Sequence, residues 1–62
     1  MPLAIVWLSE KEAAAYLDVS ISTIRRWRRI GNGPVSFRIG GIIRYQQADL
    51  DTFIQEHTAK TH

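Results

Sequence analysis

The chain has 62 residues and no cysteine, so we expect one small domain without a disulfide framework or a thiolate metal site. Its longest apolar run, Leu3–Leu8, has six residues, far fewer than the roughly 20 that a membrane-spanning helix needs, and it lacks the basic leader of a signal peptide. The formal net charge of only +2 conceals a strong separation, because residues 19–48 contain six arginines and no acidic residue.

The apolar segment Leu3–Leu8 comes first in the chain. We interpret it as an extra strand or a cover for the core, or alternatively as a sticky surface for a second copy or a partner protein. Its last residue, Leu8, lies where a hydrophobic staple packs back onto the first turn of a following helix.

The first helix is predicted at Glu10–Leu17. Ser9 and Glu12 have the S-x-x-E spacing of a capping box, in which each side chain satisfies a backbone donor at the helix start. The acidic residues of the first turn complement the helix dipole, and the run of alanines that follows favours helix. The candidate core contacts of this helix are Ala13, Tyr16 and Leu17.

The next three residues, Asp18–Ser20, hold only a tight turn. Ser20 is a second N-cap, which predicts a helix over Ile21–Ile30. Gly31 ends this helix at the position where a left-handed residue is usual. Two short helices with so tight a connection form a helix-turn-helix.

The second helix separates its apolar and cationic residues. At about 100° per residue, Ile24 and Trp27 define its buried side. The residues that point outward together are Ser22, Arg25, Arg26 and Arg29. Arginine pairs with the O6 and N7 atoms of guanine in the major groove and also grips phosphate, so this direction favours a DNA-binding face over a merely solvated basic one.

Arg28 falls on the flank of the same helix, nearer the core. It either contacts phosphate or serves the structure, as a cation in the last helical turn or as a partner of Asp49 or Asp51.

A hairpin follows the loop at residues 31–34. The sequence predicts strands at Val35–Ile39 and Ile42–Tyr45, joined by the two-residue turn Gly40-Gly41. The alternation places Val35, Phe37, Ile39, Ile43 and Tyr45 inside, and Arg38 and Arg44 together on the other face. The two glycines either let a phosphate approach the backbone or simply make the turn.

The last helix is predicted at Gln47–His57, with Leu50, Phe53 and Ile54 as its core-facing stripe. We expect Ala59–His62 to be frayed. The fold class is therefore mainly α with a small β-hairpin, a winged helix-turn-helix with a two-stranded wing. It is a single domain over residues 1–62, with its core at about 8–57.

Three segments together resemble the small winged helix-turn-helix proteins of the excisionase type, which are related to the DNA-binding half of MerR-like regulators. They are LSEKEAAAYLDVSISTIRRWRR (Leu8–Arg29), GNGPVSFRIGG (Gly31–Gly41) and IRYQQADLDTFI (Ile43–Ile54). The resemblance implies sequence-specific duplex binding, with the second helix in the major groove and the wing over the minor groove. It implies as helix contacts Ser22, Thr23, Arg25, Arg26 and Arg29, and as wing contacts Arg38, Gly40, Gly41 and Arg44.

The chain departs from this family at two positions. Relatives often carry a basic residue where this chain has Ile42, and another where it has Gln46, so the charge that the wing offers to phosphate is lower here. Ile42 either touches a neighbouring protomer, wedges into the minor groove, or rests on Trp7 or another side chain.

The resemblance implies a recombination directionality factor, which bends DNA, loads cooperatively with further copies and steers an integrase toward excision in the bacterial or phage cytoplasm. The alternatives are a small transcriptional regulator of the same fold and a module that binds an acidic protein. We expect no enzyme, cofactor, small-molecule ligand or metal site. His57 and His62 have no cysteine near them, and Asp49 and Asp51 face apart on their helix.

Overall fold

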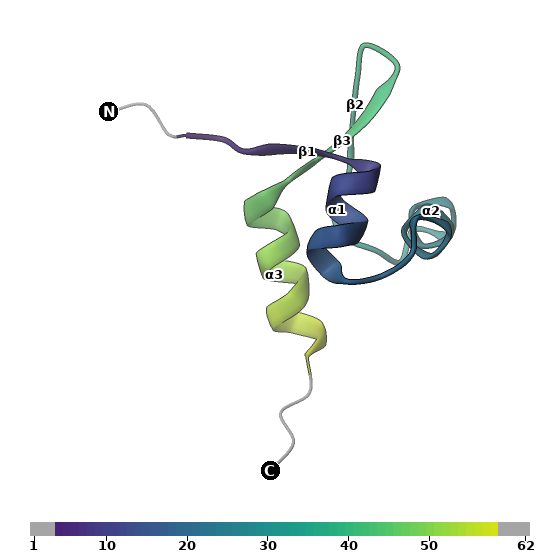
Figure 1. Ribbon diagram of the computed structural model, residues 1–62, viewed down its shortest axis with the longest axis vertical. Coiled ribbons are helices and arrows are strands. Elements are labelled where there is room, and N and C mark those ends of the chain that lie inside the picture. Colours follow the sequence, from purple (N-terminus) through teal and green to yellow (C-terminus); the bar gives the residue numbers. More distant parts are fainter. Residues whose placement is uncertain (1–3, 59–62) are drawn as a thin grey trace.

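The computed structural model describes residues 4–58 and contains three helices and three strands in the order β1, α1, α2, β2, β3, α3 (Figure 1). The three helices confirm the predicted bounds: α1 is Glu10–Leu17, α2 is Ile21–Ile30 and α3 is Gln47–His57. The expected fraying of Ala59–His62 lies outside the described residues, as does Leu3. None of the described helices has the length and apolar character needed to cross a lipid bilayer.

Side chains and left-handed residues define both ends of the helix-turn-helix. Ser9 and Glu12 form the predicted capping box, with Ser9 N donating to Glu12 Oε1 at 2.8 Å and Glu12 N donating to Ser9 Oγ at 3.1 Å. Ser20 caps α2 through the backbone N–H of Thr23. Asp18 ends α1 at φ 59°, and Gly31 ends α2 at φ 71°. The turn between the two helices is therefore short and fixed.

The sheet has three antiparallel strands in the order β1-β3-β2, where two had been predicted. The strands are β1 at Trp7–Ser9, β2 at Phe37–Ile39 and β3 at Ile42–Gln46. The apolar N-terminal segment thus supplies an extra strand, which was one of its two interpretations. Leu8 is paired with Tyr45, and Gln47 N donates to Val6 O at 3.0 Å just beyond the pairing.

The predicted inward face of β2 is wrong. Phe37 pairs with Arg44, Arg38 with Ile43 and Ile39 with Ile42. Residues directly opposite each other share a face, so Phe37 and Ile39 lie opposite the face of Ile43 and Tyr45. The two-residue turn dictates this register: once Ile39 faces Ile42, both strands cannot place their odd-numbered residues on one face. β2 is also shorter than predicted, because Val35 and Ser36 precede its pairing.

The core lies where α1, α2, β3 and α3 meet, on one face of the sheet. Its buried residues are Ala13, Ala14, Ile24, Tyr45 and Leu50. Packed against them are Leu8, Leu17, Val19, Ile21 and Ile43. Leu8 thereby fills the place predicted for a hydrophobic staple. Tyr16 and Ile54 were predicted in the core and are exposed; the Tyr16 hydroxyl instead donates to Asp51 and accepts from Gln47 Nε2, which joins α1 to α3 at the surface.

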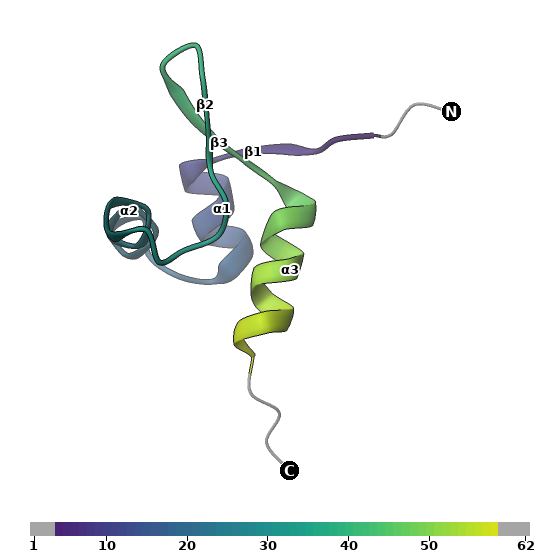
Figure 2. The same cartoon turned by 180° about the vertical axis from the view of Figure 1, so that it is seen from behind.

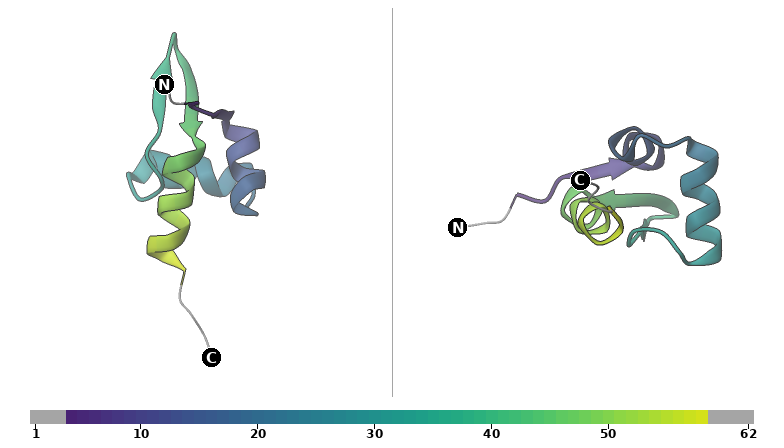
Figure 3. Two further views of the ribbon diagram at one scale, coloured as in Figure 1. Left: turned by 90° about the vertical axis from the view of Figure 1, so that its left-hand side faces the viewer. Right: turned by 90° about the horizontal axis from the view of Figure 1, so that it is seen from below.

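The molecule is flat, with extents of 41 × 33 × 18 Å. α2 lies at one end, packed mainly on α1, while the N-terminal segment extends to the opposite end (Figure 3). Residues 31–36 return from α2 to the hairpin on the face opposite α1 (Figure 2). The hairpin tip projects beyond the helices, so α2 and the wing are the two outlying parts of the molecule.

Candidate nucleic-acid interface

The outward side of α2 presents the side chains that the helical period had placed there. Ile24 is fully buried, and Trp27 and Arg28 are half-buried. Four polar or cationic residues are exposed together, and we call them the arginine face: Ser22, Arg25, Arg26 and Arg29. Their helical positions lie within about 50° of the outward direction, so one surface can meet them simultaneously.

Thr23, the fifth helix contact that the family resemblance implies, has a different environment. It is half-buried, and its Oγ1 lies 2.9 Å from Ser20 Oγ, in the N-cap of α2. Its hydroxyl therefore already has a partner inside the protein, unlike the cationic groups of the arginine face.

Trp27 connects α2 to α3. Its ring lies 5.5 Å from that of Phe53 at an interplanar angle of 46°, and Phe53 stacks in turn on His57 at 4.1 Å. The loop closes over the same side chain: a Cβ added at Gly33 would lie 2.8 Å from Trp27 Cβ and 3.7 Å from Cε3 of the indole. Glycine is therefore required at position 33 by close approach, and the aromatic contacts join α2 to α3.

Arg28 pairs with neither Asp49 nor Asp51, as one interpretation had it, but with Glu10 in the first turn of α1. Its Nε and Nη2 donate to Glu10 Oε2 at 2.9 and 2.8 Å. The other carboxylate oxygen, Oε1, accepts from Arg25 Nε at 3.2 Å. Sequence reasoning missed Glu10 because its partners lie 15 and 18 residues away, and the only local signal was an acid in a first helical turn.

Tyr45 lies beneath this ion-pair cluster and is almost completely buried. Burial raises the pKa of its hydroxyl, and the charge of Glu10 acts in the same direction. The positive charge of Arg28 acts in the opposite direction and lowers that pKa in part. The hydroxyl therefore stays protonated near neutral pH.

The two wing arginines lie on opposite faces of the sheet, so the prediction that they share one is wrong. Arg38 pairs with Ile43 and is exposed. Arg44 pairs with Phe37 on one side and Ser9 on the other, is half-buried, and donates from Nη1 to its neighbour's carbonyl, Ile43 O, at 3.0 Å. Of these two arginines, only Arg38 is therefore exposed on the wing.

The glycines of the hairpin are required by the turn itself. Gly40 and Gly41 have φ values of 59° and 84°, and two consecutive left-handed residues are what a tight two-residue hairpin of this hand needs. This geometry accounts for both glycines without invoking a close approach to phosphate, which remains a prediction.

An apolar surface covers the outer face of the sheet, and sequence reasoning missed the part of it that β2 contributes, Phe37 and Ile39. We call it the outer sheet face; its exposed residues are Ile5, Trp7, Phe37, Ile39 and Ile42. Trp7 and Phe37 meet edge to face at 5.4 Å across β3. Ile42 pairs with Ile39 at the hairpin tip. The missing signal was the register, since the turn sets which apolar residues of β2 face outward.

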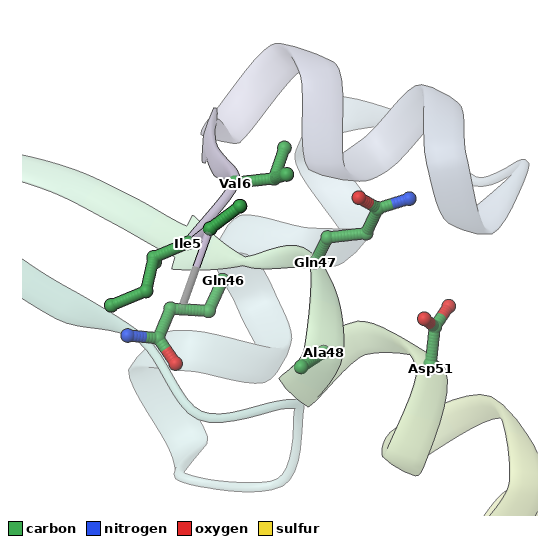
Figure 4. A pocket seen from close by; sticks show the side chains of 7 residues that line it. Ile5, Val6, Gln46, Gln47, Ala48 and Asp51 are labelled. Atoms are coloured by element: carbon green, nitrogen blue, oxygen red, sulfur yellow. The ribbon is translucent and has the colours of Figure 1, made fainter. Parts of the chain in front are cut away.

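A groove of about 460 Å³ lies between the N-terminal segment and the start of α3. Its lining is mainly apolar, with Ile5 and Gln46 on one side and Ala48 at the first turn of α3 (Figure 4). The groove is at the end of the molecule opposite α2 and does not include the arginine face. Within residues 4–58 no group of three or more histidines and acids is placed to hold a metal ion.

Comparison with known proteins gives one finding. Residues 7–58 match a family model that is described as a helix-turn-helix domain. This is a family of small excisionase-like DNA-binding domains. No curated protein matches the chain.

Proposed function

The chain belongs to the helix-turn-helix domain family, which makes it a DNA-binding protein, and on that premise we propose that it is a recombination directionality factor. In this proposal α2 reads the major groove of a specific duplex, the wing follows the adjacent backbone, and the bound protein biases an integrase toward excision. The observation that supports it most directly is the arginine face, in which three arginines point outward from a helix whose opposite side is buried.

In this proposal the arginine face has two tasks. A major groove admits one α-helix, and guanidinium groups on its outward side reach either guanine edges or phosphates. Arg26 and Arg29 have no ion pair with an acid among the described residues, whereas Arg25 has a carboxylate partner and Arg28 is half-buried. From their shared outward direction we assign Arg25, Arg26 and Ser22 to base reading, with Arg29 reading a base or a phosphate.

The wing contributes a smaller charge. Arg38 is exposed on the hairpin and follows the phosphate backbone in this proposal, with Arg44 adding long-range attraction from the other face. Gly40 and Gly41 bring the hairpin tip close to the duplex. Because Ile39 and Ile42 form an apolar tip beside them, the wing also has the chemistry of a wedge that unstacks a base step and bends the duplex.

The outer sheet face supports the recombination part of the proposal. A surface that carries Trp7 and Phe37 without a covering layer is of the kind that binds protein. It lies on the opposite face of the sheet from the core, so a bound protein would leave α2 accessible. The integrase and a second copy of this chain on an adjacent DNA site are the two partners proposed for it.

An excision assay tests the whole proposal. Purified protein is added to an integrase encoded beside it and to a supercoiled plasmid that carries the attachment sites. Excision should depend on the protein, and footprinting should place it beside the integrase core site. Protection of a promoter with no effect on excision would favour a transcriptional regulator and contradict this function.

A salt titration tests the DNA-binding step by itself. With about five phosphates neutralised, the logarithm of the binding constant should fall with the logarithm of salt concentration with a slope near −4 to −5. A flat response would instead indicate a module that binds an acidic protein. Gel mobility of circularly permuted fragments measures the bend, and cooperative binding to a multi-site fragment measures self-association.

A further inference from the structure

One carboxylate divides its two oxygens between two arginines of α2, and the two arginines differ in exposure. The side chains of Glu10 and Arg28 are 17% and 30% exposed, whereas that of Arg25 is 59% exposed. We propose that Glu10 is a positioning residue for DNA recognition, which fixes Arg25 so that its terminal amino groups meet one base pair. The inference rests on the proposed function, since it requires α2 to lie in the major groove.

The contact at Arg25 involves Nε alone, at 3.2 Å from Glu10 Oε1. A guanidinium carries five N–H donors, so this contact leaves the four donors of Nη1 and Nη2. Guanine offers two acceptors in the major groove, O6 and N7, and bidentate pairing uses two donors. With Nε engaged, the pair that remains for guanine is Nη1 with Nη2, which fixes the approach end-on.

Fixing the side chain before binding improves discrimination. An arginine on an open helical surface samples many rotamers, and ordering it on the duplex opposes binding. Glu10 is itself held by the half-buried Arg28 through Nε and Nη2, so it is a rigid support for Arg25. The guanine contact then forms at lower entropic cost, and a wrong base meets a group that does not readily move aside.

The same carboxylate acts against general affinity. A negative charge beside the arginine face opposes the approach of every phosphate backbone, whatever its sequence. The contact with Arg28 alone would suffice to hold α1 to α2, and it would not require the second oxygen to engage an exposed reader. The two oxygens therefore have separate effects: Oε2 holds the helices together, and Oε1 orients Arg25.

The test compares discrimination with general affinity in Glu10→Gln, which keeps the shape and removes the charge. The preferred site is first selected with the wild-type protein from random duplexes. Dissociation constants are then measured for that site, for each single-base variant and for an unrelated duplex, at one salt concentration. Glu56→Gln on α3 is the matched control, since it makes the same charge change on another helix.

Glu10→Gln should bind the unrelated duplex roughly 2- to 5-fold more tightly and lose about 10-fold discrimination at one base pair. The same substitution in an Arg25→Ala background should cause no further loss of discrimination. Glu56→Gln should leave discrimination unchanged. A uniform change at all base pairs, or a loss that persists without Arg25, would overturn the inference and leave Glu10 as a contact between helices only.

A second variant keeps the inference falsifiable if Glu10→Gln folds poorly by circular dichroism. Arg25→Lys retains the charge but has no planar fork, so it should lose discrimination at the same base pair without gaining affinity for unrelated duplex. Full discrimination in Arg25→Lys would also overturn the inference. If the wild-type protein binds no duplex, both the proposed function and this inference are overturned. If the wild-type protein binds and the variants discriminate as well as it does, this inference alone is overturned.

Discussion

α2 and the sheet both combine apolar and cationic side chains, but they arrange them differently. On α2 the two kinds occupy opposite sides: Ile24 is buried and the arginine face is exposed. On the sheet they are mixed, because Arg38 shares a face with Ile43 while Arg44 lies among the apolar residues of the outer sheet face. A helix with one buried stripe has a single outward direction, whereas a sheet has two faces, and the helices cover only one of them here.

The comparison separates residues that hold the fold from residues that meet a partner. On α2 this separation follows the helix circumference, so neighbouring positions have opposite roles. On the sheet it follows the pleat for the apolar residues, since those on the covered face contribute stability and those of the outer sheet face contribute contacts. Arg38 is the exception, because it is exposed on the hairpin although it shares the face of Ile43. Four predictions test this separation, from the largest expected effect to the smallest.

Ile24→Ala should destabilise the protein by about 2–5 kcal/mol, because it removes methyl groups from the fully buried side of α2. So small a domain has little reserve, and we expect substantial unfolding at 37 °C by thermal circular dichroism. Ile30→Ala makes the same change on the exposed side of the same helix and should alter stability by less than about 0.5 kcal/mol. Equal effects would contradict the assignment of the two sides.

Arg26→Ala should weaken binding to the preferred site by about 1–3 kcal/mol and relax the sequence preference, with stability unchanged. Fluorescence anisotropy with a set of single-base variants measures both quantities. Arg38→Ala, on the wing, should instead weaken binding to all sequences alike and lower the salt slope by about 1. A uniform loss from both substitutions would exclude base reading by α2.

Phe37→Ala should cost about 1 kcal/mol of stability, chiefly its edge-to-face contact with Trp7, because the side chain lies on the uncovered face. If the outer sheet face binds protein, this variant should also lose cooperative DNA loading or excision while a single site is bound normally. Ile43→Ala, on the covered face, should show the opposite pattern, with a larger loss of stability. Unchanged cooperativity and excision in Phe37→Ala would remove the outer sheet face from the proposed function.

The smallest expected effect is the contribution of Tyr45 to the free energy of unfolding, which depends on pH. Its pKa is raised in the folded state by burial, so the unfolded chain loses the phenolic proton at lower pH than the folded one. This contribution to stability is complete below pH ~10 and is lost as pH rises through the higher folded pKa. Denaturant titrations from pH 9 to 11.5 should show a steeper decline for wild type than for Tyr45→Phe, and parallel curves would contradict it.

The helices could be predicted from the sequence because their signals are local. Ser9 with Glu12, Ser20 and Gly31 fix helix ends through bonds that span three or four residues, and the period of α2 then fixes which residues point outward. The arginine face needed no information from elsewhere in the chain. Which residues of the protein contact the DNA remains a prediction.

The errors all involve contacts between elements, which the pattern within one element does not show. The faces of β2 depend on its register with β3, which the two-residue turn sets by pairing Ile39 with Ile42. Glu10 finds its arginines on another helix. Tyr16 looked like a core residue by spacing, yet its hydroxyl contacts α3 at the surface. Composition indicates how apolar a segment is, but only the assembled molecule determines which layer covers it.

Asp18 shows how an exposed residue can have narrow mutational tolerance. It is the one non-glycine residue among residues 4–58 with a positive φ, and its N–H bonds to the last turn of α1. Glycine, asparagine and aspartate adopt this conformation readily, whereas β-branched side chains do not. The connection between the first two helices therefore requires a backbone conformation that few residue types adopt readily, so Asp18→Val should cost about 1–2 kcal/mol of stability although the position faces solvent.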